Sequence, residues 1–183
     1  MEKFLNIPVY DSVLNGTSDA GALPPIGLLD AAVDFTASGV QVGDIVHQST
    51  DNEYFVVDEV LSTTTLKLSA LDGGTLPIPG SKAYFIHSAT NSTGVLVSSV
   101  NVGLVEQAST STTTIAYDAP ASGNDLITLT HTPIAAGSEI ARDTVEEEIV
   151  KSLQTKWNEP SYEKIGEALI LADNIKVIGI ALT

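Results

Sequence analysis

Three histidines are the side chains of this chain best suited to acid–base or metal chemistry, and they lie far apart in the sequence. His47, His87 and His131 each fall within a strand-like pattern. A metal site needs ligands that converge, often with a short local spacing such as HxxxH, which the chain lacks. We therefore predict no metal site, and we expect the histidines to be surface or half-buried residues of a sheet.

Carboxylates occur close together at Asp58-Glu59 and at Glu146–Glu148. Neighbouring residues of a strand point to opposite faces of a sheet, so Asp58 and Glu59 cannot act together as a glycosidase pair. The three glutamates spread around a helix, where we expect a solvated surface. Neither group predicts acid–base catalysis.

One turn, formed by residues 118–124 and followed by a strand, carries Asp118, Asn124 and Asp125. These side chains could hold calcium, although they lack the spacing of an EF-hand. The alternative is ordinary turn chemistry, in which Asp and Asn side chains bond nearby backbone amides. Asn15 and Asn91 each begin a glycosylation sequon, which carries meaning only in a secreted chain.

The sequence contains no GxSxG elbow, no phosphate-binding loop and no dinucleotide fingerprint. It also has no cysteine, which excludes disulfides, thiolate zinc sites and thiol catalysis. We therefore predict no catalytic residue, no cofactor-binding residue and no cofactor. The expectation is a protein that is not an enzyme.

The formal net charge is −15, from 8 basic and 23 acidic residues. Such a surface repels phosphate backbones and anionic lipid, so we expect neither nucleic-acid nor membrane partners. The charge suits either solubility or docking onto a basic partner. Hydrophobic residues make up 43% of the chain, which favours a folded protein. No signal peptide and no apolar run long enough to span a bilayer is found, so we expect synthesis in a cytoplasm.

Between Asp34 and His87, short apolar runs alternate with turn-forming clusters, which predicts a string of antiparallel strands. In Thr65–Ser69 the apolar residues fall at every second position, so both leucines lie on one face. The expected strands are Asp44–Gln48, Tyr54–Val60, Thr64–Ser69 and Lys82–His87. We interpret residues 34–90 as a small β-barrel or meander.

Residues 1–33 are expected to form an N-terminal strand and an arm-like loop. Lys3–Val9 resembles a short strand, and Asp11–Pro25 is rich in Gly, Ser, Asn and Asp, with a tight turn expected at Asn15-Gly16. Ile26–Val33 is expected to be a short strand. The loop could order against a neighbouring subunit, or it could wrap on its own barrel.

Residues 91–183 predict an antiparallel sheet with one helix, and this part could form one domain with residues 34–90. The polar cluster Ser88–Thr93 marks the expected boundary. In Asp125–Thr132 the residues Ile127, Leu129 and His131 share one face, opposite the threonines, and we expect a hairpin with the preceding strand. The expected strands are Gly94–Val105, as one strand or as two with a bend, Thr110–Tyr117, Asp125–Thr132, Ala168–Leu171 and Ile175–Leu182.

The expected helix runs from about Ser138 to Trp157. Its apolar residues recur every four positions and predict one buried stripe, made of Val145, Ile149, Leu153 and Trp157. Ser138 caps a helix that begins there, and a capping box at Thr144 fits a later start. Glu147 and Lys151 have the spacing of a favourable ion pair. The predicted fold class is therefore mainly β with one α-helix packed on a C-terminal sheet (α+β).

Several short segments of the sequence resemble small virion structural proteins of tailed phages, especially those of marine and cyanobacterial phages. They are Gly39–Val46, Ala83–Ile86, Thr112–Tyr117, Leu126–His131 and the helix end Leu153–Trp157. The resemblance lies in these short segments and in the composition, and it extends over Phe35–Trp157.

The resemblance implies a non-enzymatic building block of the virion, assembled in the host cytoplasm. It implies a capsid decoration or cement protein that contacts the major capsid protein or other virion subunits and forms a homo-oligomer. The alternative is a tail, fibre or head–tail component that binds a receptor or carbohydrate. In this interpretation Lys3–Pro25 and one edge strand of the sheet would contact capsid or sister subunits.

Overall fold

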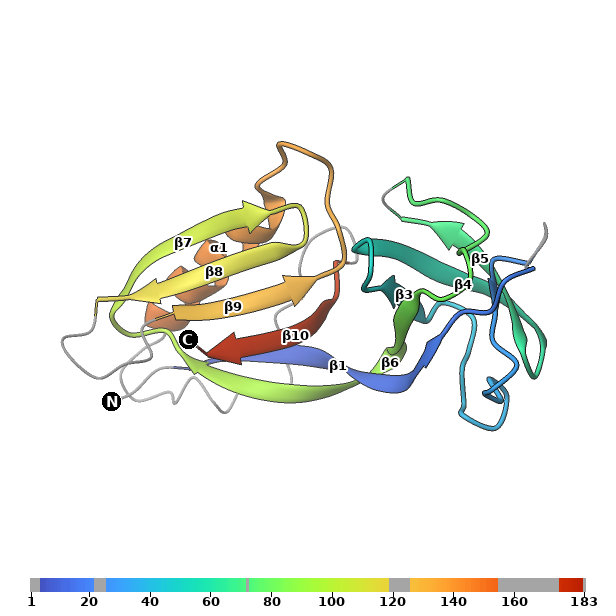
Figure 1. The fold of residues 1–183 in the computed structure, drawn as a ribbon. Coiled ribbons are helices and arrows are strands. Elements are labelled where there is room, and N and C mark those ends of the chain that lie inside the picture. The colour runs from blue at the N-terminus through green and yellow to red at the C-terminus, as the bar shows by residue number, and fades with distance from the viewer. Residues whose placement is uncertain (1–3, 22–25, 72, 119–125, 155–174, 183) are drawn as a thin grey trace. The chain divides into compact units, whose positions relative to one another are not determined.

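The computed structural model describes residues 4–21, 26–71, 73–118, 126–154 and 175–182. These residues are mostly strands, with one α-helix among them (Figure 1). This confirms the predicted class, mainly β with one helix. In chain order the elements are β1 (Phe4–Thr17), β2 (Leu28–Leu29), β3 (Ile45–Gln48), β4 (Glu53–Ser62), β5 (Thr65–Ala70), β6 (Ala83–Ser98), β7 (Val102–Ser109), β8 (Thr112–Tyr117), β9 (Leu126–His131), α1 (Ile140–Gln154) and β10 (Val177–Leu182).

The strands form one mixed sheet of ten strands in the order β2-β5-β4-β3-β6-β1-β10-β9-β8-β7. The pairing of β1 with β10 is parallel, with Val9 opposite Val177, whereas β7 to β10 pair antiparallel. The pairings of β7 to β10 agree with the predicted C-terminal antiparallel sheet, and the parallel pairing joins β10 to β1, which was not predicted to belong to it. The chain divides into two compact units, one of residues 1–9 and 93–183 (unit 1) and one of residues 10–92 (unit 2).

Unit 2 contains the strands expected between Asp34 and His87. β3 pairs with β4 on one side and with β6 on the other, both antiparallel. Leu66 and Leu68 of β5 are both buried, as their alternation predicted. They join a core cluster with the aromatic rings of Phe35, Phe55 and Tyr84, and this aromatic content supplies much of the apolar surface that holds the unit together.

A buried polar pair lies in the core of unit 2. The Tyr84 hydroxyl donates a hydrogen bond to Oδ2 of Asp30 at 2.7 Å, and the backbone amide of Ala32 donates to Oδ1 of Asp30 at 2.9 Å. Burial, and then the Asp30 carboxylate, raise the pKa of Tyr84 above its ordinary range. Asp30 and Tyr84 are 1% and 0% exposed, so the pair satisfies groups that would otherwise be costly to bury.

In unit 1 the hairpin of β8 and β9 is confirmed, with Ile115 opposite Ile127. Ile127, Leu129 and His131 lie on the buried face, as the alternation predicted. Ile127 and Leu129 share a core cluster with Val105 of β7. This buried face is the one that α1 packs against, since Ala141, Val145 and Ile149 of the helix belong to the same cluster. Figure 1 shows α1 behind β7 and β8.

The described helix begins at Ile140, slightly later than the predicted start at Ser138, and its buried stripe does not include Leu153. Val145 and Ile149 are buried, but Leu153 is 48% exposed. The predicted membership of Leu153 in the core is therefore wrong, and Leu153 instead lines a hollow between β7 and α1. Ser138 Oγ accepts a hydrogen bond from the amide of Ile140, so Ser138 acts as the cap, and Thr144 Oγ1 instead donates to the Ile140 carbonyl. Trp157, Pro160 and the strand predicted at 168–171 lie outside the described residues.

The N-terminal segment is a strand, where a loop was predicted from Asp11 onwards. β1 continues to Thr17, so the tight turn expected at Asn15-Gly16 is wrong. β1 lies between β6 and β10 in the sheet. Pairing on both sides supplies hydrogen bonds to its backbone, which outweighs the turn preference of its Asn, Gly and Ser residues. The predicted arm-like loop is therefore wrong for Asp11–Thr17, whereas the expected contact of this segment with capsid or sister subunits stays a prediction.

β6 is also longer than predicted, because it runs through the polar cluster Ser88–Thr93 to Ser98. Gly94–Val105 forms two strands, since Asn101 adopts a positive φ of 62° in the connection between β6 and β7. Positive φ is tolerated by Asn better than by most residues. Among the described residues, no helix is both long and apolar enough to cross a membrane.

We predict that Gly16→Ala destabilises unit 2. A Cβ at residue 16 would lie 2.5 Å from both the Asp30 carboxylate and the Tyr84 hydroxyl, and it would force the buried pair apart. The expected loss is about 1–3 kcal/mol in the free energy of unfolding, measured by urea denaturation. Gly179→Ala is the matched control, because its nearest neighbour would be 3.6 Å away. Equal stability of Gly16→Ala and the original protein would contradict the packing described.

Candidate functional site

The three histidines do not converge. His131 is 0% exposed and His87 is 9% exposed, so the expectation that they are surface or half-buried residues is wrong for both. His47 is half-buried, and its ring stacks on that of Tyr54 with centroids 4.4 Å apart. Among the described residues, no three His, Asp or Glu side chains group closely enough to hold a metal ion.

His131 belongs to a buried hydrogen-bond network in unit 1. Its Nδ1 lies 2.8 Å from the Thr132 carbonyl oxygen, which can only accept, so Nδ1 carries the hydrogen. In the neutral ring Nε2 is then an acceptor, 3.1 Å from the Thr113 hydroxyl and 3.4 Å from Nε2 of Gln107. Both ring nitrogens are thus engaged within the protein, and the network positions strands.

Gln107 extends this network to the helix. Its Oε1 lies 3.2 Å from the Thr113 hydroxyl and accepts a hydrogen bond from the backbone amide of Arg142 at 3.3 Å. That amide belongs to the first turn of α1, where backbone donors have no partner within the helix. The side chain of one β7 residue therefore fixes the N-terminal end of α1 over the sheet.

A β-bulge between Val57 and Glu59 places Asp58 and Glu59 beside Ser69 and Lys67, which share one face of β5, so the expected opposite orientation is wrong. Asp58 accepts a hydrogen bond from Ser69 Oγ at 2.5 Å, and Glu59 lies opposite Lys67 in the sheet. On α1, Lys151 forms ion pairs with Glu147 at 2.9 Å and with Glu148 at 2.7 Å, so the predicted pair with Glu147 is confirmed. These contacts are exposed, and they contribute little to stability.

The proposed calcium turn is described only at Asp118. Its amide donates to the Asn101 carbonyl at 2.8 Å, which continues the antiparallel pairing of β7 with β8 and tests neither the calcium site nor the turn chemistry. Asn124 and Asp125 lie outside the described residues. Both sequon residues, Asn15 and Asn91, lie in strands, namely β1 and β6.

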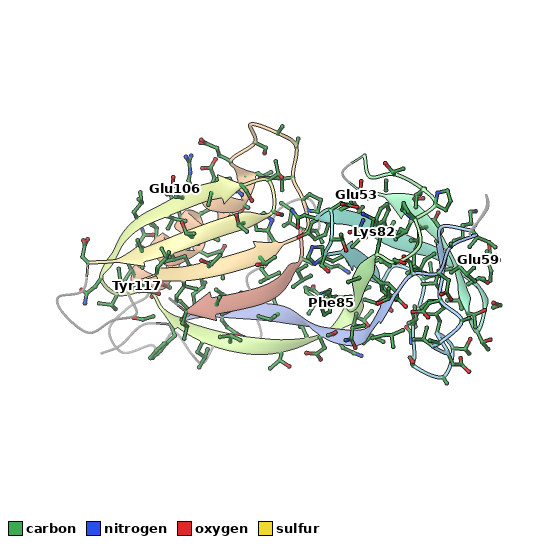
Figure 2. All side chains as sticks on the ribbon, in the orientation of Figure 1. Glu53, Glu59, Lys82, Phe85, Glu106 and Tyr117 are labelled. Carbon is green, nitrogen blue, oxygen red and sulfur yellow. The ribbon has the colours of Figure 1, made fainter. Side chains whose placement is uncertain are left out.

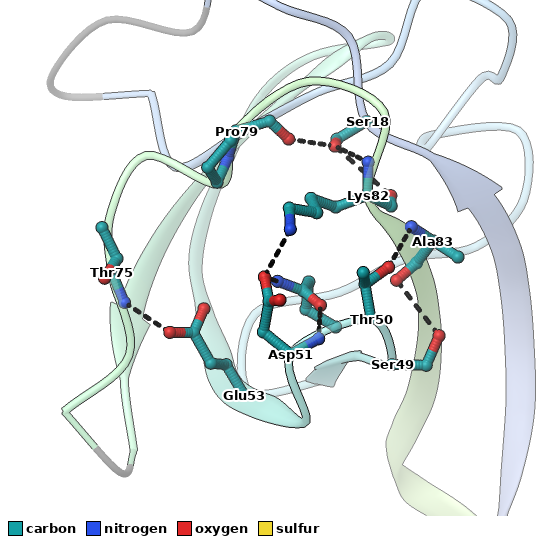
Figure 3. Close-up of polar contacts among 10 residues, drawn as sticks. Ser18, Ser49, Thr50, Asp51, Glu53, Thr75, Pro79, Lys82 and Ala83 are labelled. Carbon is teal, nitrogen blue, oxygen red and sulfur yellow. Dashed lines mark hydrogen bonds and ion pairs between the residues drawn. The ribbon is translucent and has the colours of Figure 1, made fainter.

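A polar cluster ties three segments of unit 2 together (Figure 3). Lys82 Nζ lies 2.7 Å from a carboxylate oxygen of Asp51, and Gln48 Nε2 donates to the same carboxylate at 2.8 Å. Lys82, and then Gln48, lower the pKa of Asp51. Ser18 Oγ accepts from the amide of Lys82 at 3.1 Å and donates to the Pro79 carbonyl. Because each group has a partner inside the cluster, its role is to hold these segments in place.

A row of rings crosses the sheet of unit 2. Tyr54, His47 and Phe85 lie opposite one another on β4, β3 and β6. The rings of His47 and Phe85 have centroids 6.5 Å apart, and Phe85 is 39% exposed. Figure 2 labels Phe85 on β6. An exposed ring on a flat sheet face is the kind of surface on which a sugar ring can stack.

An apolar hollow of about 400 Å³ lies among β6, β8, β9 and β10 in unit 1. Its walls include Leu96 and Leu182, which are 51% and 61% exposed, and Tyr117. The Tyr117 hydroxyl donates to the Ser98 carbonyl at 2.6 Å, and burial raises the pKa of Tyr117 to about 12. This hydroxyl therefore stays protonated and structural at neutral pH.

A second hollow of unit 1, the β7–α1 groove, combines apolar and acidic side chains. It has a volume of about 370 Å³ and lies between β7 and α1, with Leu104, Glu146, Ile149, Val150 and Leu153 among its lining residues. Leu104, Val150 and Leu153 are 57%, 49% and 48% exposed. β7 is the terminal strand of the sheet, so one side of its backbone lacks a strand partner among the described residues.

The sequence pattern did not identify the β7–α1 groove. Val150 and Leu153 are three positions apart on the helix, beside the stripe of Val145 and Ile149. The apolar stripe is therefore wider than one face needs for burial, and this width was the sequence feature that could have indicated an exposed apolar surface. The strand order was not predictable from the pattern, so the position of β7 at an edge could not be foreseen.

Comparison of the chain with protein-family models, with curated proteins and with solved structures found no match. The functional argument therefore depends on the described residues and their chemistry.

We predict that His131 makes unit 1 less stable in mild acid. Burial lowers the pKa of His131 below its ordinary value of 6.5. The unfolded chain therefore binds a proton more readily than the folded chain, so this contribution is complete above pH 6.5 and decreases as the pH falls below it. Urea unfolding at pH 7.5 and 5.5 should show a smaller loss of stability for His131→Gln than for the original protein. An identical loss in both proteins would contradict this assignment.

Proposed function

We propose that the chain is a non-enzymatic structural protein of a tailed-phage virion, most specifically a capsid decoration or cement protein. Its partners in this proposal are the major capsid protein or other virion subunits, with assembly in the host cytoplasm and a homo-oligomeric state. The finer architecture that we propose with it is a small β-barrel or meander in residues 34–90 and a C-terminal sheet packed by α1.

The observation that carries the proposal is the β7–α1 groove. A cement protein stabilises a shell through contacts between subunits, and such contacts need an exposed apolar surface on a rigid framework. Leu104, Val150 and Leu153 supply the apolar surface. β7 belongs to the sheet, and α1 is anchored to it through Gln107, so the framework holds both walls in register.

The buried polar groups support the same proposal. His131, Asp30 and Lys82 are titratable groups, and each forms hydrogen bonds or an ion pair with neighbours within its own unit. Their contacts join strands, loops and a helix. This use of polar groups suits a structural part that is assembled in many copies.

The alternative is a tail, fibre or head–tail component with a role in receptor or carbohydrate binding. The observation that favours it is the row of Tyr54, His47 and Phe85, whose outer member is exposed. The two proposals use different surfaces in different units. They also imply different numbers of copies per virion, which separates them experimentally.

We predict that the protein co-purifies with intact virions of the phage that encodes it, at a copy number close to that of the major capsid protein. The measurement is quantitative mass spectrometry of gradient-purified particles, with the free protein of the lysate as reference. A few copies per particle would instead favour the tail or fibre role. Complete absence from purified particles would contradict both virion roles.

A further inference from the structure

The edge of β7 is a place where another strand can add to the sheet. Among the described strands β7 has one neighbour, β8, and the register of this pair runs from Val102 to Ser109. Along a strand, alternate residues direct their backbone N–H and C=O groups to opposite sides, so an edge strand presents unpaired groups. An extended peptide can pair with such an edge through main-chain hydrogen bonds and gain specificity from its alternate side chains.

The side chains around this edge define the apolar and charged groups that an added strand needs. On one face, the β7–α1 groove offers Val150 and Leu153 as an apolar floor beside Glu146. Leu104 borders the groove at the strand edge, and its side chain shares with that of Glu106 the face of β7 opposite the buried Val105, since the two residues are two positions apart. Figure 2 labels Glu106 on β7. Each face thus pairs an apolar contact with a carboxylate.

The cations nearest to this edge are already engaged. Arg142 forms ion pairs with Glu139 and Asp143, and Lys151 does so with Glu147 and Glu148. In the part of the chain that the structure describes, neither Glu106 nor Glu146 forms an ion pair. Two carboxylates beside an apolar groove therefore attract a ligand that carries positive charge and apolar side chains together.

The charge also selects between candidate occupants. A second copy of this chain would bring the same acidic edge, from a chain of net charge −15, against itself. Like charges on paired strands are destabilising, and an isologous contact would repeat them on both sides of the twofold axis. A basic segment of a different protein removes this repulsion.

We propose that the β7 edge and the β7–α1 groove bind an extended segment of a neighbouring virion subunit in which pairs of apolar residues alternate with pairs of Lys or Arg, so that each face of the added strand carries both kinds of side chain. The segment adds as a strand beside β7. Its apolar side chains cover Leu104 on one face and the groove on the other, and its cations lie near Glu106 and Glu146. This inference rests on the proposed function for the identity of the partner, whereas the chemistry of the segment comes from the groove.

The test uses the full chain and synthetic peptides. The probe is a fluorescent eight-residue peptide of sequence Val-Val-Lys-Lys-Val-Val-Lys-Lys (the Val/Lys peptide), which matches the eight residues of β7 and carries Val and Lys on both faces as a strand. Fluorescence anisotropy should show saturable binding, whereas a peptide with Glu in place of Lys should not bind. N-methylation of alternate backbone amides of the Val/Lys peptide should abolish binding, because it removes the donors that pair with a strand edge. Equal binding of the N-methylated peptide, or of the Glu peptide, would overturn the inference.

Matched variants of the protein locate the binding. Glu106→Lys should weaken binding of the Val/Lys peptide by about fivefold, whereas Glu59→Lys, the same charge change on an exposed strand residue of unit 2, should leave the affinity unchanged. Leu104→Asp should weaken it by about tenfold, with Leu61→Asp as its control, since both leucines are exposed. Equal effects of a variant and its control would overturn the assignment to β7.

Three further outcomes test this inference, and the first two also separate it from the proposed function. Normal incorporation of both Glu106→Lys and Leu104→Asp into virions would overturn the inference and leave the virion role intact. Peptide binding with the predicted charge dependence by a protein that is absent from virions would sustain the groove chemistry and overturn the identity of the partner. Occupation of the groove by a second copy, seen as dimerisation that Leu104→Asp abolishes, would overturn the inference.

Discussion

The packing of α1 on the inner face of β7, β8 and β9 is the contact on which the rest of unit 1 depends. Ala141, Val145 and Ile149 of the helix share one buried cluster with residues of the three strands. The side chain of Gln107 fixes the first turn of the helix from below. Because both walls of the β7–α1 groove belong to this assembly, its geometry is set by the core and does not depend on a loop.

The same packing explains why apolar surface remains exposed. A helix buries only the stripe that faces the sheet, and the sheet ends at β7. Val150 and Leu153 line the hollow between α1 and β7 with Leu104 and stay about half exposed. Exposed apolar side chains beside an unpaired strand edge are a liability for a lone protein, because they invite association. The carboxylates of Glu106 and Glu146 restrict that association to partners of opposite charge.

Periodicity predicted much of the fold because local pattern and burial agree there. The alternation of Leu66 and Leu68, and of Ile127 and Leu129, identified their strands and the buried faces. It could not identify the second half of β1, whose Asn15 and Gly16 favour turns in isolation and are held in a strand by neighbours distant in sequence. Tertiary pairing overrides local preference in such segments.

The candidate site was hidden from the sequence for a related reason. Leu153 continues the spacing of the helix stripe, and whether it is buried depends on where the sheet beneath it ends. His131 was placed on the correct face, but its full burial depends on Gln107 and Thr113, which lie on other strands. Strand order decides both outcomes, and strand order is a property of the whole fold.

The most direct measurement for the central claim, that the β7 edge is an assembly surface, is hydrogen exchange of the protein free in solution and within purified virions. If the account is right, amides of Val102–Ser109 exchange at least about tenfold more slowly in the particle, because the added strand pairs with them. Unchanged exchange in Val102–Ser109, with new protection confined to strands of unit 2 such as Thr65–Ala70, would contradict it.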